Sequence, residues 1–77
     1  METSAAEIRY RRETATLVRR FKGGHITFPN CIAALDAALA KVILTLDKDQ
    51  LPALRDLMMA NNAEVMKELE KRGPQEN

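Results

Sequence analysis

The residue best suited to covalent chemistry is Cys31, the only cysteine among the 77 residues. It stands within the first turn or so of a predicted helix, where the positive end of the helix dipole can lower a thiol pKa. The only histidine, His25, lies six residues earlier. A catalytic triad needs a third group that orients the base, and the chain has no second histidine to complete one. It also lacks the nucleophile-elbow motif that presents a catalytic nucleophile. Cys31 also precedes Leu35 by one turn on an apolar face, which favours a buried structural cysteine.

Metal binding would need more ligands than the chain offers. Structural zinc takes four protein ligands and catalytic zinc three, whereas the chain has one histidine and one cysteine. Acidic residues form two close pairs, Asp47 with Asp49 and Glu64 with Glu68. Helix capping explains the first pair and a solvated helix face the second, because catalytic carboxylates need burial or a cleft to shift their pKa values. We therefore expect no catalytic residue, no metal, no cofactor and no enzymatic activity.

The strongest structural signal is the segment 28–46, which is predicted to form a helix that is apolar nearly all round. Thr27 is its expected N-cap, and the helix is expected to end near Thr45. Alternating spacings of four and three mark one packed face: Phe28, Ile32, Leu35, Leu39, Val42 and Leu46. The other faces hold mostly further apolar residues: Ala33, Ala34, Ala37, Ala40 and Leu44. Such a helix must be covered on several sides, and a chain of this length has little else to cover it.

A first helix is predicted before this segment. Ser4 followed by Glu7 matches a capping box, which begins the helix. Positive charge in its last turn suits the helix dipole, and the helix is expected to run to about Phe21. Gly23-Gly24 can adopt the left-handed conformation that ends a helix.

A third helix is predicted from about Gln50 to Arg72. Asp49 is the preferred N-cap, because it places Pro52 in the first turn. Asp47 with Gln50 also fits a capping box, so a preliminary turn there is the alternative. We predict a single helical domain over 1–73 and a disordered tail over 74–77.

The fold class predicted is all-α, with helices two and three as an antiparallel hairpin because the link between them is short. The basic N-terminal helix packs on this hairpin or on a neighbouring chain. Two hairpins would meet through their apolar stripes in an oligomeric bundle. The predicted interface comprises Phe28, Ile32, Leu35, Leu39, Val42, Leu54, Met58, Asn61 and Val65.

Asn61 interrupts the apolar stripe of the third helix. A polar residue inside such a stripe fixes the register and number of partners, at some cost in stability. Alternatively, Asn61 and Asn62 lie at a rim and hydrogen-bond water. The sequence leaves both interpretations open.

The net charge of the chain is only +1, but its N-terminal part is basic and the remainder is acidic. Residues 1–25 hold six basic and three acidic residues, and 26–77 hold six and eight. One face of the first helix carries Arg9, Arg12, Arg19 and Arg20. Nucleic-acid binding through these arginines is the alternative function, although three-helix DNA readers usually place a basic recognition helix third, and here that helix is acidic.

The single cysteine and the absence of an export signal indicate the cytoplasm. A membrane span is not expected, because Asp36 and Lys41 interrupt the apolar segment. A core of this size contributes only roughly 3–5 kcal/mol, so oligomerisation is the remaining route to stability. We predict a small, non-enzymatic, self-associating module that binds or regulates a protein partner.

Overall fold

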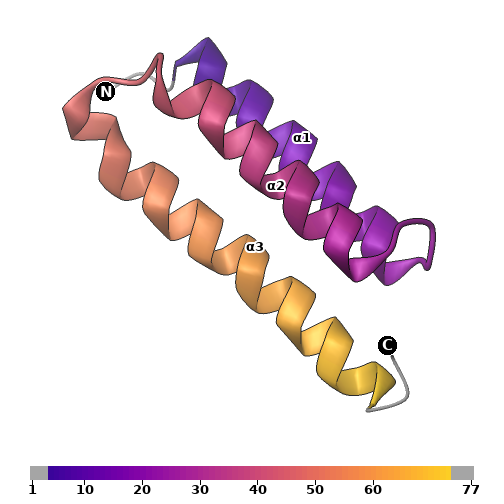
Figure 1. Cartoon of the computed structure of the whole chain (residues 1–77). Helices are drawn as coiled ribbons and strands as arrows, with labels where there is room; N and C mark the ends of the chain where they lie inside the picture. The colour runs from indigo at the N-terminus through magenta and orange to yellow at the C-terminus, as the bar shows by residue number, and fades with distance from the viewer. Residues whose placement is uncertain (1–3, 74–77) are drawn as a thin grey trace.

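The computed structural model describes residues 4–73, which form three α-helices and one short 3-10 turn. The helices are α1 (Ala5–Lys22), α2 (Phe28–Ile43) and α3 (Leu51–Arg72), and the turn η1 (Lys48–Gln50) leads into α3. They run side by side along the long axis of a molecule that measures 44 × 17 × 16 Å (Figure 1). The all-α prediction is confirmed. The tail expected at 74–77 lies outside the described residues.

The first two helices begin at the residues that the sequence predicts. Ser4 Oγ accepts a hydrogen bond from the Glu7 N–H at 3.1 Å, and Thr27 Oγ1 accepts one from the Asn30 N–H at 3.3 Å. Each cap satisfies one of the backbone donors that a helix N-terminus leaves without an intrahelical partner. The Glu7 carboxylate pairs with Arg11 one turn later at 3.1 Å.

The turn between α1 and α2 reverses the chain in five residues. The His25 N–H donates to the Arg20 carbonyl at 2.8 Å, and the Gly24 N–H donates to the Phe21 carbonyl at 3.1 Å. These two bonds form a Schellman motif, which requires a left-handed residue after the helix. Gly24 supplies it with φ +79°, as the Gly-Gly pair predicts.

The start of α3 differs from the preferred prediction. Asp49 is not the cap of α3: the 3-10 turn η1 comes first, with Asp47 as its N-cap. The Gln50 side-chain oxygen accepts a hydrogen bond from the Asp47 N–H at 3.2 Å. The alternative of a preliminary turn is therefore correct.

The end of α2 also differs from the prediction by two residues. The helix ends at Ile43 rather than near Thr45. The Thr45 N–H and hydroxyl both donate to the Val42 carbonyl at 2.9 Å. This i→i−3 pattern replaces the i→i−4 bonds of the helix, so the chain leaves α2 for the link to η1.

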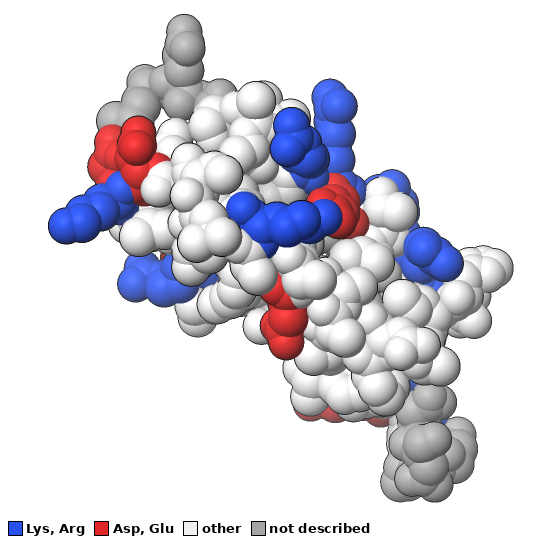
Figure 2. Space-filling model, turned by 45° about the horizontal axis from the view of Figure 1, so that its top comes forward, with Lys and Arg blue, Asp and Glu red and all other residues white. Residues whose placement is uncertain are grey.

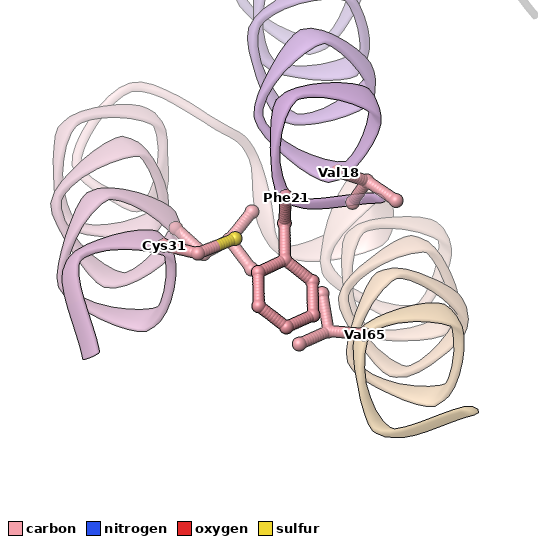
Figure 3. Packing of buried hydrophobic residues seen from close by; sticks show 5 residues of the cluster. Val18, Phe21, Cys31 and Val65 are labelled. Carbon is pink, nitrogen blue, oxygen red and sulfur yellow. The ribbon is translucent and has the colours of Figure 1, made fainter. Parts of the chain in front are cut away.

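The core lies where the three helices meet, and α1 contributes most to it. The antiparallel hairpin of α2 and α3 is present, but α1 packs more extensively on each of them than they pack on one another. Figure 3 shows the ring of Phe21 from α1 between Cys31 of α2 and Val65 of α3. A second cluster toward the other end joins Tyr10, Ala38, Val42 and Leu54. The first helix therefore packs on its own chain.

The C-terminal end of α3 is fastened to the end of α1. The Arg72 guanidinium lies 4.2 Å from the centre of the Phe21 ring and donates a hydrogen bond to the Phe21 carbonyl. A cation over an aromatic face is stabilising, and more so when partly desolvated. The Lys22 ammonium adds an ion pair with Glu64 at 2.8 Å.

Candidate interaction surface

Four of the predicted interface residues belong to the core of the single chain. The side chains of Leu35, Val42, Leu54 and Val65 are buried without a second copy. The reason is that α1 covers the stripes of α2 and α3 that a second hairpin was expected to cover. In the folded chain these four side chains are therefore core residues rather than an exposed interface.

The other five predicted residues are only half-buried: Phe28, Ile32, Leu39, Met58 and Asn61. Phe28 packs against Phe21 of α1, whereas Leu39 and Met58 line a surface between α2 and α3. Ile43, which is 47% exposed, extends this surface along α2. We define the α2–α3 face as the set Ile32, Asp36, Leu39, Ile43, Leu51, Arg55 and Met58.

A hollow of about 520 Å³ opens on the α2–α3 face near the turn η1. Aliphatic side chains of both helices form its walls, among them Leu39, Ile43, Leu51 and Met58, and Lys48 and Arg55 stand beside them. Uncharged side chains also cover much of the surface in the view of Figure 2. An apolar hollow bounded by a few polar groups is a common form of binding surface.

A buried polar group lies near the middle of α3. The amide nitrogen of Asn61 is buried near the Tyr10 hydroxyl and makes no well-formed hydrogen bond with residues 4–73. An unsatisfied buried donor costs free energy, so a native structure rarely keeps one without a reason. Burial raises the pKa of the Tyr10 hydroxyl, the Asn61 side chain acts in the opposite direction, and the charge of Asp36 raises the pKa further. The Asn61 side chain and the charge of Asp36 thus both influence the Tyr10 hydroxyl.

The two residues best suited to catalysis by type, Cys31 and His25, do not form a catalytic site in the structure. Cys31 is fully buried, its Sγ lies 3.8 Å from the Leu17 carbonyl oxygen, and burial raises the pKa of the thiol. A raised pKa disfavours the reactive thiolate, so the expectation of a buried structural cysteine is confirmed. His25 is exposed in the turn after α1. In the described part of the chain, no three His, Cys, Asp or Glu side chains lie close enough together to hold a metal ion.

Two of the three glutamates of α3, Glu64 and Glu68, form ion pairs. The hydrogen bond from Lys22 lowers the pKa of Glu64, and Glu68 pairs with Arg72 at 3.1 Å. Asp47 and Asp49 are exposed at the turn η1. These carboxylates therefore form ion pairs within and between helices or lie at the start of a helical turn.

The basic surface of α1 lies where the sequence places it. All four arginines are exposed: Arg9, Arg12, Arg19 and Arg20. No carboxylate of residues 4–73 forms an ion pair with any of them, because Glu7 pairs with Arg11 and Glu13 with Lys41. This surface is therefore open to an anionic partner.

Comparisons with protein-family models, with curated proteins and with solved structures find no match to this chain. Among residues 4–73, no helix is both long and apolar enough to span a lipid bilayer.

Two features of the structure are absent from the sequence prediction. Arg55 lines the hollow although its residue type alone indicates a solvated position. The Tyr10 hydroxyl lies near the Asn61 side chain. The position of Tyr10 on the apolar stripe of the first helix could have indicated this, because a buried tyrosine hydroxyl usually has a polar partner.

Proposed function

We propose that the protein is a non-enzymatic helical module that associates with a second copy through the α2–α3 face. The observation that carries the proposal is the group of aliphatic side chains that the fold leaves around the hollow, with Ile43 47% exposed. Leu44, the C-cap residue that follows α2, is 86% exposed. Contiguous exposed apolar surface is typical of an interaction site.

The energetics of a small domain support this proposal. Full burial of one Leu or Ile side chain is worth roughly 1.5–3 kcal/mol. A core of this size contributes only roughly 3–5 kcal/mol. Covering several half-buried side chains with a second copy would therefore raise the stability by an amount comparable to that of the core itself.

The biological role that fits such a module is to bind or regulate another protein, and the compartment that fits is the cytoplasm. The support for the compartment is the single cysteine, which is buried as a free thiol. Cysteines in oxidising compartments are usually paired as disulfides.

Replacing Ile43 with arginine should weaken self-association about 100-fold, because a charge placed in an apolar interface loses its hydration without gaining a partner. Ile8→Arg is the matched control. Ile8 is 41% exposed, close to the value for Ile43, but it lies on the outer side of α1. Sedimentation equilibrium of the wild type and both variants gives the three dissociation constants.

The proposal requires that Ile43→Arg weaken self-association far more than Ile8→Arg does. Equal weakening by both would show that added charge disturbs association regardless of its place. Unchanged association in the Ile43→Arg variant would exclude the α2–α3 face as the contact surface.

A second candidate function is binding to the phosphate backbone of nucleic acid. The observation that favours it is the α1 surface with four exposed arginines that carry no carboxylate partner among the described residues. Arginine suits phosphate because its planar guanidinium can donate two parallel hydrogen bonds.

Binding of this kind should fall steeply with salt, with a log–log slope of about −3 to −4 if all four arginines contact duplex phosphates. Fluorescence anisotropy with a labelled duplex measures the slope. The double variant Arg12→Glu with Arg19→Glu should abolish binding, whereas Lys67→Glu with Lys71→Glu, an equal change of charge on α3, should preserve most of it. Equal losses in both would indicate a net-charge effect rather than a binding surface.

A further inference from the structure

The α2–α3 face carries two charged residues, one of each sign. Asp36 lies four residues after Ile32 and three before Leu39, so it shares their side of α2. Arg55 projects from α3 and lines the hollow beside Leu39 and Ile43. The other members of the face are aliphatic or Met, and Lys48 stands at the edge of the hollow, on η1.

Neither charge has a strong partner within the chain. Arg55 contacts its neighbour Asp56 at 3.8 Å, and both side chains are more than half exposed. Exposed pairs of this kind contribute little. Asp36 forms no ion pair with any residue of the described range 4–73 and is exposed. The two groups do not pair with one another across the hollow.

The antiparallel course of α2 and α3 fixes where these charges stand along the face (Figure 1). Leu39 and Arg55 line the same hollow, so they stand at a similar level. Asp36 precedes Leu39 by three residues, which is about 4.5 Å along a helix axis. An arginine side chain easily spans that offset.

Resting on the self-association proposed above, we infer that two copies dock face to face about a two-fold axis parallel to the helices, with α3 of each copy over α2 of the other. Asp36 of one copy then pairs with Arg55 of the partner subunit, and the symmetry repeats the pair. The apolar side chains around the hollow cover their counterparts in the same contact. The two ion pairs would set the register of the copies, because charge complementarity across an interface confers specificity.

The test is a pair of charge reversals, Asp36→Arg and Arg55→Asp. Each variant alone should associate about 100-fold more weakly than the wild type, because it places like charges opposite one another. An equimolar mixture should recover association as a heterodimer, because one chain then offers two arginines and the other two aspartates. Native mass spectrometry distinguishes the heterodimer from either homodimer by mass.

Matched control reversals are Lys67→Asp and Glu70→Arg, which change charge by the same amounts at exposed positions of α3 outside the face. These variants should associate like the wild type. Circular dichroism checks the fold of all four. If either face reversal unfolds, the neutral variants Asp36→Asn and Arg55→Gln carry the test, each with about 10-fold weaker association expected.

The outcomes separate the two proposals. A wild-type chain that remains monomeric contradicts both. A wild type that associates while neither face reversal weakens it, or while the mixture fails to recover, overturns this docking arrangement and leaves the self-association standing.

Discussion

Val65→Asp is expected to unfold the protein, whereas Met66→Asp on the next residue of α3 is expected to leave it folded. The Val65 side chain is 0% exposed and contacts the Phe21 cluster, while Met66 is 46% exposed. A charge buried without a partner costs several kcal/mol, which approaches or exceeds the stability expected of a domain of this size. Helical circular dichroism at room temperature should be lost in the first variant and kept in the second.

This comparison tests the placement of α1 over the hairpin. If α1 did not cover Val65, both positions would lie on accessible faces of α3 and the two variants would behave alike. Similar thermal midpoints would therefore contradict the core as described.

Asn61→Leu is expected to stabilise the folded chain by about 1–3 kcal/mol, because it removes a buried amide donor that makes no well-formed hydrogen bond with residues 4–73. The leucine would also extend the apolar stripe that runs from Leu54 to Val65. For a domain of this size, such a gain raises the melting temperature by roughly 4–8 °C per kcal/mol. The oligomeric state should match that of the wild type, because Asn61 lies outside the α2–α3 face.

A lower melting temperature of the Asn61→Leu variant would contradict this expectation. It would show that Asn61 makes a hydrogen bond in solution, to water or to the Tyr10 hydroxyl, and that this bond stabilises the fold. Calorimetry together with light scattering on the same samples measures both quantities.

Much of the local structure could be predicted because its signals are local. Ser4, Thr27 and the Gly23-Gly24 pair act on backbone groups within one turn, so their residue types were enough. At the start of α3 two aspartates offered equally local solutions. The Gln50 side chain decided between them by bonding to the Asp47 N–H.

The arrangement of the helices was harder to predict, since periodicity shows that a helix has an apolar face but not which helix covers it. The stripes through Leu35 and Val65 were interpreted as an interface, and the structure covers them with α1. The interaction surface therefore lies to one side of those stripes. Arg55 and Asp36 could not be assigned to it from sequence, because an exposed charge on a helix looks the same whatever lies beside it.

Self-association is tested most directly by the molar mass of the unmodified chain in solution, measured by light scattering over a concentration series from low micromolar upward. The proposed contact through the α2–α3 face predicts a mass that rises from 8.7 kDa for the single chain toward twice that value. A mass that stays at 8.7 kDa throughout the series, up to hundreds of micromolar, would contradict it.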